Sequence, residues 1–239
     1  MNAPDEGRRP LRADHAEPRD GRLDVDSDVR VAYRPDRGSV PAFSLGVGAR
    51  LRSGTVLYAG SRIGTGLQTG HHVVIREECE IGDDVSVWSN TVIDYGCRIG
   101  NRVKIHCNCY VAQYTEIGDD AFLAPGVTCA NDLYPGQADS ASMMSGPVIG
   151  EHAQLGVNVT VLPYVRVGAG CIVGAGSVVT RDVPPGAVAY GNPATVHGDV
   201  ADLTPIQERI AHTNGSVSTY RLAREQGGAR GDRDRIGLA

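Results

Sequence analysis

Polar residues recur along the chain at a regular interval. His72, Asn90 and Asn108 occupy every eighteenth position, His71 precedes the first of them, and His106 comes two residues before the last. A histidine can accept a proton near neutral pH, and an asparagine amide can both donate and accept hydrogen bonds. If the fold brings these residues into one column, they could move a proton and orient a reacting group.

The elements that would hold this column follow from a six-residue repeat of aliphatic side chains. The repeat contains one exception, Thr69, and resumes with a shift of two after an interruption. Its positions are Leu45, Leu51, Leu57, Ile63, Thr69, Ile75, Ile81, Val87, Ile93, Ile99, Ile105, Val111, Ile117 and Leu123, then Ile149, Leu155, Val161, Val167, Val173 and Val179.

Each position four residues after the aliphatic one is small or β-branched, except Leu67, and glycine recurs one residue after it. Such glycines are expected where the backbone turns with a positive φ or passes close to another strand. A period of six is a multiple of two and not of 3.6, so it predicts short strands with a corner every sixth residue. Stacking such coils buries a continuous narrow core.

The predicted fold class is therefore all-β, a parallel β-helix whose coils have three sides of one repeat each, between six and seven coils long. Residues three repeats apart then lie above one another at about 5 Å per coil. This places His72, Asn90 and Asn108 in a column and stacks His106 over Trp88.

Composition limits the range of functions. The 239 residues carry a formal net charge of −5, which provides no basic field for a general nucleic-acid partner. No apolar run reaches the ~18 residues of a membrane span, and the N-terminus has no hydrophobic signal core, so a cytoplasmic location is the default. Five of the six cysteines occupy core positions, which predicts buried thiols; Cys107 is the exception.

The chain divides into four predicted segments. Residues 1–21 are expected to be a disordered leader and residues 22–44 an N-terminal cap over the open first coil. The β-helix spans 45–197, and residues 130–147 leave it as a loop of about 14 residues beyond the repeat, which is where function is expected on a rigid scaffold. Residues 198–239 are expected to form a short helix at 202–212 and a disordered tail.

Three features together resemble the left-handed β-helix acyltransferases of the hexapeptide transferase superfamily. They are the six-residue repeat, the loop with Asn131-Asp132 and Tyr134-Pro135, and the closing sequence VGAGSVVTRDVPPGAVAYGNPA. The resemblance covers about residues 60–197. It implies a left-handed helix, acetyl-CoA as the acyl donor, and a homotrimer with active sites between neighbouring subunits.

A finer resemblance concerns the acceptor. The K-I-x-x-N sequence from Lys104 to Asn108, followed by the loop, is similar to bacterial enzymes that acetylate nucleotide-linked amino sugars. It implies that Asn108, with backbone amides, orients the thioester or the acceptor. Either His71 or His106 would accept the proton, and the sequence does not separate them. His72 and Asn90 are candidate substrate-binding residues of the same column.

The remaining candidates bind the two substrates. Asp132 and Tyr134, with Asn131, would bind the acceptor or fix the loop. The resemblance places the pantetheine arm along the backbone near Gly156 and Ala175. Arg181 would lie near the phosphates or adenine of coenzyme A, or it is a solvated cation at the end of the helix.

Three alternatives stand beside N-acetylation. O-acetylation of a sugar or natural-product hydroxyl is the main one, and a non-catalytic β-helix binding module is another. A γ-class carbonic anhydrase would need a third histidine, but position 111 is valine, so no metal is expected.

Overall fold

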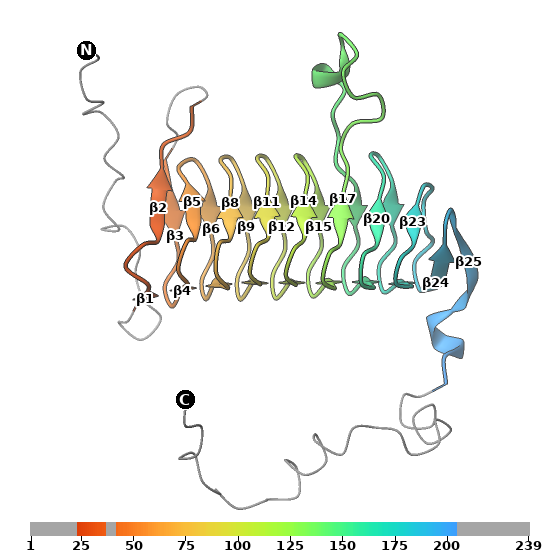
Figure 1. The fold of residues 1–239 in the computed structure, drawn as a ribbon. Helices are drawn as coiled ribbons and strands as arrows, with labels where there is room; N and C mark the ends of the chain where they lie inside the picture. Colours follow the sequence, from red (N-terminus) through yellow and green to blue (C-terminus); the bar gives the residue numbers. More distant parts are fainter. Residues whose placement is uncertain (1–22, 37–41, 205–239) are drawn as a thin grey trace, which may run out of the picture. The chain divides into compact units, whose positions relative to one another are not determined.

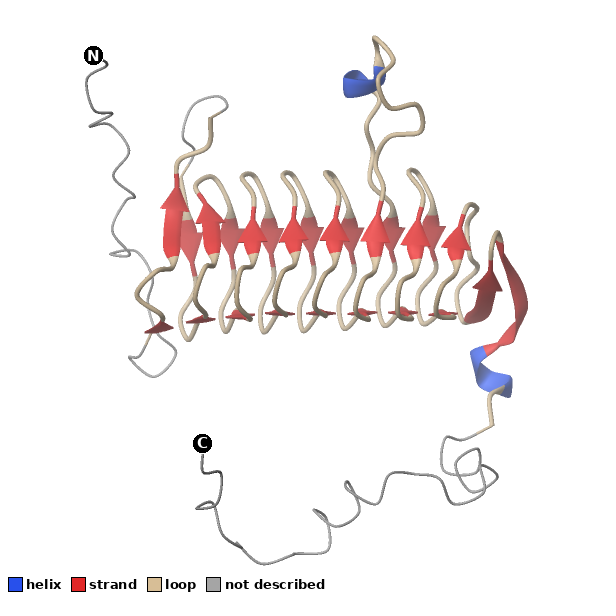
Figure 2. Ribbon diagram, viewed as in Figure 1, coloured by secondary structure: helices blue, strands red, loops and turns tan. Residues whose placement is uncertain are grey.

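The computed structural model describes residues 23–36 and 42–204. These residues form the predicted all-β left-handed parallel β-helix, in which short strands stack into three sheets joined by tight turns (Figures 1 and 2). Helical structure among them is limited to two 3₁₀ turns, η1 (Ser140–Ser142) and η2 (Val200–Asp202). None of the helices in this part of the chain is long and apolar enough to cross a membrane.

Sheets A, B and C are the three sides of the coil. Sheet A has seven strands: β3 (Ser44–Leu45), β6 (Arg62–Ile63), β9 (Glu80–Ile81), β12 (Arg98–Ile99), β15 (Glu116–Ile117), β18 (Val148–Ile149) and β21 (Arg166–Val167). Sheet B has ten: β1 (Asp24–Val25), β4 (Arg50–Leu51), β7 (Gln68–Thr69), β10 (Ser86–Val87), β13 (Lys104–Ile105), β16 (Phe122–Leu123), β19 (Gln154–Leu155), β22 (Ile172–Val173), β24 (Ala187–Gly191) and β25 (Ala194–Asp199). Sheet C has eight: β2 (Arg30–Tyr33), β5 (Val56–Tyr58), β8 (Val74–Ile75), β11 (Val92–Ile93), β14 (Tyr110–Val111), β17 (Thr128–Cys129), β20 (Thr160–Val161) and β23 (Val178–Val179).

The core is built from the two predicted sets of inward positions. Every residue of the six-residue repeat is buried, and so is every residue four positions later. The one polar member of the repeat is accommodated by a hydrogen bond, since the hydroxyls of Thr69 and Thr55 lie 3.0 Å apart. Because equivalent strands of successive coils pair in register, the predicted columns are confirmed; Val87, for example, pairs with Ile105.

Two backbone requirements shape each corner, and they fall on different residues. The recurrent glycines one position after the repeat lie where coils approach each other closely: a Cβ on Gly118 would lie 2.6 Å from the nitrogen of Glu151. The left-handed conformation occurs two residues later, for instance at Asn108 with φ 59° and Tyr114 with φ 62°. Close approach, rather than positive φ, is therefore the reason for these glycines.

The helix is longer than the aliphatic repeat indicates. β1 and β2, within the stretch predicted as a cap, pair in parallel with β4 and β5 and so add a coil. At the other end β24 pairs in parallel with β22, and β25 folds back on it antiparallel. The coils therefore number about eight. The leader at 1–21 and nearly all of the helix predicted at 202–212 lie outside the described residues.

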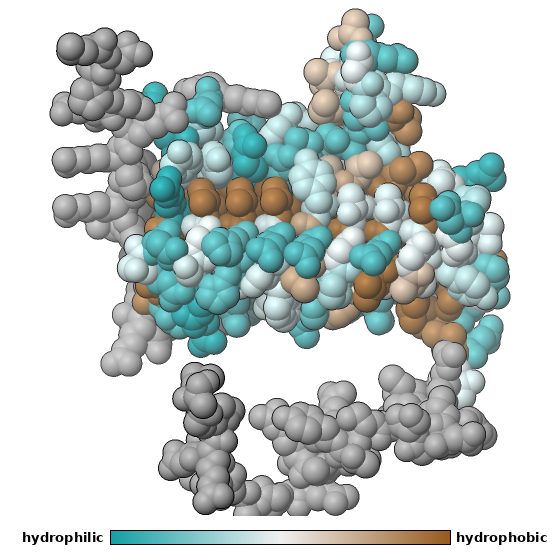
Figure 3. All heavy atoms as spheres, in the orientation of Figure 1, coloured by the Kyte–Doolittle hydropathy of each residue, from teal (hydrophilic) through white to brown (hydrophobic). Residues whose placement is uncertain are grey.

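The outer faces of sheets A and C differ in chemistry. On sheet A the outward residues include Arg62, Glu80, Arg98 and Glu116. On sheet C they are mostly valine and threonine, and Figure 3 shows a hydrophobic row over β5, β8 and β11. The loop at 130–147 leaves between β17 and β18 and projects away from the stacked coils (Figure 1).

Candidate functional site

The predicted site residues lie on two of the three edges of the helix. The B–C edge comprises the turns from sheet B to sheet C, at residues 70–73, 88–91, 106–109, 124–127, 156–159 and 174–177. The C–A edge comprises the turns from sheet C to sheet A, including 94–97, 112–115, the loop at 130–147 and 180–183. On the B–C edge are His71, His72, Asn90, His106, Asn108, Gly156 and Ala175; on the C–A edge are Asn131, Asp132, Tyr134 and Arg181.

The turn that carries Asn108 is held from inside the helix. The hydroxyl of Thr91, a buried core residue, donates to the carbonyl of His106 over 2.7 Å and accepts from the amide of Cys109 over 3.2 Å. The amide of Asn108 donates to the carbonyl of Ser89 in the preceding coil over 3.1 Å. The backbone is thus fixed on three sides, while the side chain of Asn108 is exposed and available to a ligand.

The two candidate bases sit in different surroundings. The ring of His106 stacks on Trp88 with centroids 4.3 Å apart and planes 7° apart, as predicted. His71 is exposed, and its amide donates to Ser89 Oγ over 2.9 Å. The two histidines are about two coil steps apart, roughly 10 Å. A single acceptor group therefore contacts one of them and not both.

His72 and Asn90 continue the polar column beneath Asn108. All three have positive φ, with values of 56°, 60° and 59°. Asparagine tolerates this conformation better than most residues, so the turn itself favours Asn90 and Asn108. His72 leans over the preceding coil, because a Cβ on Gly54 would lie 2.2 Å from its Nδ1.

On the C–A edge a buried carboxylate organises a polar network. Asp94, 7% exposed, accepts hydrogen bonds from Tyr110 Oη over 2.8 Å and from Gln113 Nε2 over 2.6 Å. Burial, followed by the hydrogen bond to Asp94, raises the pKa of Tyr110 to about 12. The tyrosine therefore stays protonated and remains a donor throughout the neutral range.

The network ends at the base of the loop. Asn131 Nδ2 donates to Gln113 Oε1 over 2.5 Å, and the carbonyl of Asn131 accepts from the amide of Ser145 over 2.9 Å, which closes the neck. Farther out, Asp132 Oδ1 accepts from the amide of Tyr134 over 2.9 Å. Asp132 thus fixes the loop through this oxygen, and Tyr134 is 65% exposed.

The candidates for coenzyme A are also divided between the edges. Gly156 and Ala175 continue the line of the B–C edge beyond Asn108. Arg181 lies on the C–A edge, is exposed, and lines a hollow of about 330 Å³ with residues of the β24–β25 hairpin, among them Pro193 and Thr195. Arg181 and Ala175 therefore lie on different edges of the helix.

Sheet C separates the two groups of site residues. From Asn108 on one edge to Gln113 on the other, the chain advances five residues through β14. At about 3.3 Å per residue this is at most roughly 16 Å. Within one chain, Asn108 and the loop residue Asn131 consequently do not approach the same small acceptor group.

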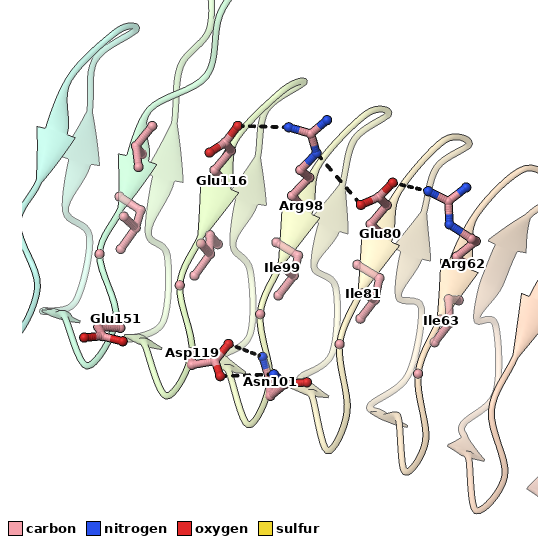
Figure 4. A pocket seen from close by; sticks show the side chains of 18 of the residues that line it. Arg62, Ile63, Glu80, Ile81, Arg98, Ile99, Asn101, Glu116, Asp119 and Glu151 are labelled. Carbon is pink, nitrogen blue, oxygen red and sulfur yellow. Dashed lines mark hydrogen bonds and ion pairs between the residues drawn. The ribbon is translucent and has the colours of Figure 1, made fainter.

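A hollow of about 870 Å³ lies elsewhere on the described surface. It runs along sheet A and is lined by the row Arg62, Glu80, Arg98 and Glu116 (Figure 4). Arg62 pairs with Glu80, and Arg98 Nη1 lies 3.3 Å from Glu116 Oε1. These exposed pairs satisfy one another, and none of the predicted site residues lines the hollow, so we assign it no chemistry.

Sequence reasoning missed Asp94, Tyr110 and Gln113. Gln113 could have been found, because it lies one full coil before Asn131 and therefore directly beneath it in the stack. Asp94 and Tyr110 are not one coil apart and meet only through the direction of their side chains. Spacing alone does not reveal such a contact.

Substitutions in this hydrogen-bond network are expected to lower the free energy of unfolding by different amounts. Replacing Asp94 with Asn is expected to lower the free energy of unfolding by about 2 kcal/mol, because the carboxylate oxygen Oδ2, which accepts two hydrogen bonds, from Tyr110 and Gln113, is lost. The remaining oxygen can still accept from the amide of Tyr95. Tyr110→Phe removes one of the two hydrogen bonds to Oδ2 and is expected to cost about 1 kcal/mol. Urea denaturation of the two variants and the parent checks this; equal midpoints for all three would contradict the role of the network.

Comparison with known proteins finds a family match over part of the repeat. The family described as bacterial transferase hexapeptide (six repeats) matches residues 96–131 and 146–181, the coils on either side of the loop. Galactoside O-acetyltransferase of Escherichia coli (strain K12) is 37% identical over 97 residues, 38% of this chain and 48% of that enzyme. The corresponding enzyme of Lactococcus lactis is 36% identical over 90 residues, 36% of this chain and 44% of that enzyme.

Solved structures give a further likeness. A mutant of perosamine N-acetyltransferase from Caulobacter crescentus, in complex with CoA and GDP-perosamine, is 32% identical, with a TM-score of 0.47 over 53% of this chain and 54% of that chain. This chain spans about half the length of the curated relatives it matches.

Proposed function

We propose that this chain, whose repeats are those of the bacterial transferase hexapeptide family, is an acetyl-CoA-dependent acetyltransferase acting on an amino group of a nucleotide-linked amino sugar. The observation that carries the proposal is the line formed by Asn108, Gly156 and Ala175 on the B–C edge. Gly156 and Ala175 follow Asn108 by about two and three coil steps, roughly 10 and 14 Å. An extended pantetheine arm along this line ends with its thioester at Asn108.

The proposed reaction is direct acyl transfer. The acceptor nitrogen attacks the thioester carbonyl, the carbon–sulfur bond breaks, and coenzyme A leaves as the thiol. The Asn108 amide and neighbouring backbone N–H groups would stabilise the oxyanion that develops on the carbonyl oxygen. His71 or His106 would take the proton that the nitrogen loses and pass it to the departing sulfur.

The active site is proposed to lie between copies of the chain in a homotrimer. Asn108 and the loop residues Asn131 and Asp132 occupy opposite edges of sheet C, so a second copy is needed to bring the two groups to one acceptor. Sheet C also carries the surface suited to an interface, because Val56, Val74 and other outward residues form its hydrophobic row (Figure 3).

A hydroxyl acceptor is the second candidate, favoured by the match to two galactoside O-acetyltransferases. A hydroxyl needs a well-oriented base, which usually has a hydrogen-bonded partner of its own. In the described part of the chain the ring contacts of His106 are stacking on Trp88 and a tilted contact with Phe122 at 4.9 Å. Stacking does not fix which ring nitrogen of His106 carries the proton, so it does not orient this histidine as a base. This supports an amine acceptor, which needs a general base less than a hydroxyl does.

The direct test is thiol release from acetyl-CoA with nucleotide-linked 3- and 4-amino sugars and with their hydroxyl counterparts. Turnover with amines alone supports N-acetylation, and turnover with hydroxyls alone replaces it by O-acetylation. Acetyl-CoA binding without turnover on either set moves the acceptor to another class. No binding of acetyl-CoA leaves a non-catalytic β-helix. The six free cysteines fit a reducing compartment, and we propose the cytoplasm.

A double variant, His71→Gln with His106→Gln, separates the two acceptors further. With an amine acceptor, kcat is expected to stay within about tenfold of the parent, because the nitrogen lone pair is already nucleophilic. With a hydroxyl acceptor, the loss of a general base lowers kcat by about 10²- to 10⁴-fold. The pH dependence of kcat in the parent and the variant shows whether a histidine titration has been removed.

A further inference from the structure

Trp88 is an exposed aromatic residue that the proposed chemistry leaves unused. It is the single tryptophan of the chain, it follows β10 directly on the B–C edge, and it is 38% exposed. One face of its indole is covered by His106, and His106 in turn contacts Phe122 with ring centroids 4.9 Å apart. The indole is thus the end of a three-ring column that runs along the helix axis.

The other face of the indole is directed toward the preceding coil, where the equivalent residue is Gly70. Glycine is required there, because a Cβ would lie 2.5 Å from the nitrogen of Ser89. The next coil back carries Arg52, whose guanidinium is held by Asp24 over 2.9 Å and by Asp26 over 3.3 Å. The column therefore has no side chain at the equivalent position of the coil between Arg52 and Trp88.

The coil spacing leaves the height of one planar ring at this position. Positions 52 and 88 are two coil steps of about 4.8 Å apart, and a ring stacked on the indole takes up one of them. His71 and Asn90 are exposed beside it and offer hydrogen-bonding groups to the edge of such a ring. A flat heterocycle with polar edges, which describes a nucleobase, fits these surroundings.

We infer that Trp88 is the stacking platform for the nucleobase of the acceptor substrate. This inference rests on the proposed function, because it takes the acceptor to be nucleotide-linked. The B–C edge orders the ligands: Gly156 and Ala175, the positions for coenzyme A, follow Asn108 in the stack, whereas Trp88 lies one coil before it. The donor therefore extends toward the C-terminal coils and the acceptor nucleotide toward the N-terminal ones.

The fluorescence of the full chain tests this directly, since Trp88 is the only tryptophan. UDP and GDP, which lack the linked amino sugar, are expected to quench it saturably, and saturating coenzyme A is expected to leave this quenching in place. Galactosamine 1-phosphate, which has no base, is expected to leave the emission unchanged. Quenching by the sugar phosphate alone would make Trp88 a sugar platform and overturn the inference.

Two further outcomes would also overturn the inference. Quenching by coenzyme A and 3′,5′-ADP, but not by the nucleoside diphosphates, would assign the stacking platform to the adenine of the donor. If none of these ligands quenched the emission, Trp88 would not be a platform for any of them. Because these titrations need no turnover, they are independent of the acetyl-transfer assay. Thiol release without nucleotide quenching rejects the platform alone. Nucleotide quenching without acetyl-CoA turnover rejects the proposed function alone.

Calorimetry with variants measures the contribution of the indole. Trp88→Leu is expected to weaken UDP binding by about 10- to 100-fold, the usual effect of losing one base–aromatic stack. The matched control is Tyr190→Leu. Tyr190 is also exposed and stacked on a histidine, His197, with ring centroids 3.7 Å apart, but it lies on β24 at the far end of the helix. An equal loss in both variants would reject a specific role for Trp88.

Discussion

Replacing Asn108 with glycine is expected to lower kcat by about 10²- to 10³-fold, the usual effect of removing one oxyanion donor. The Michaelis constant for acetyl-CoA is expected to change little, because the positions proposed to bind the pantetheine arm, Gly156 and Ala175, lie elsewhere on the edge. Glycine is the appropriate replacement, because Asn108 has φ 59° and alanine would add backbone strain. Gly126 occupies the same position in the next coil with φ 76°, so the corner accepts glycine.

The matched control is Asn158→Gly, at the equivalent position of the B–C edge with φ 56°. It makes the same chemical change in the same backbone conformation, and no catalytic role is proposed for its side chain. Steady-state kinetics of both variants with the acceptor found in the thiol-release assay provide the comparison. If both variants lose the same activity, the loss comes from changing a corner of the β-helix, and the Asn108 side chain has no special part in acyl transfer.

Truncating a central core residue is expected to cause the largest loss of stability. Ile105 is fully buried in β13 and pairs with Val87 on one side and Leu123 on the other. Ile105→Ala is expected to lower the free energy of unfolding by about 3 kcal/mol, from lost burial and the cavity left behind. Because each coil contacts only its neighbours, a weak central coil also uncouples the two halves of the helix.

Urea denaturation followed by far-UV circular dichroism measures this effect. Ile105→Val removes one methylene at the same site and is expected to cost about 1 kcal/mol. The alanine variant is further expected to unfold with a broader transition than the parent. A shift for the alanine variant no larger than that for the valine variant would show that neighbouring side chains close the cavity.

The fold could be predicted because its core repeats with a period that only stacked short strands satisfy. The backbone conformation of the corners was harder to predict from the sequence. Tyr114 has φ 62°, a conformation that bulky residues rarely adopt alone, and it does so because the coils above and below impose the turn. The backbone conformation of the turn also weakens the inference of function from the spacing of Asn90 and Asn108. These asparagines recur one coil apart partly because the turn favours asparagine.

The positions of the candidate site residues could be predicted only in part. The coil-length interval found the B–C column correctly, since it is a property of the helix, and the stacking of His106 on Trp88 followed from it. It could not show that Asn131 and Asn108 occupy opposite edges, because that depends on which side of the coil each turn falls. Nor could it show that Asp94 is shared by Tyr110 and Gln113, since that depends on side-chain direction.

The strands on either side of the loop at 130–147 keep the pairing register of the other coils, and this affects how the sequence of the protein can evolve. Thr128 pairs with Thr160 and Cys129 with Val161, as they would if the loop were absent. Closing the long connection between Cys129 and Ile149, in place of a single repeat, adds only about 1 kcal/mol of chain entropy. Loops of different length and sequence can therefore be exchanged at this corner at nearly constant stability. Because the loop is proposed to bind the acceptor, we expect selection for a new acceptor to act on this segment while the scaffold stays as it is.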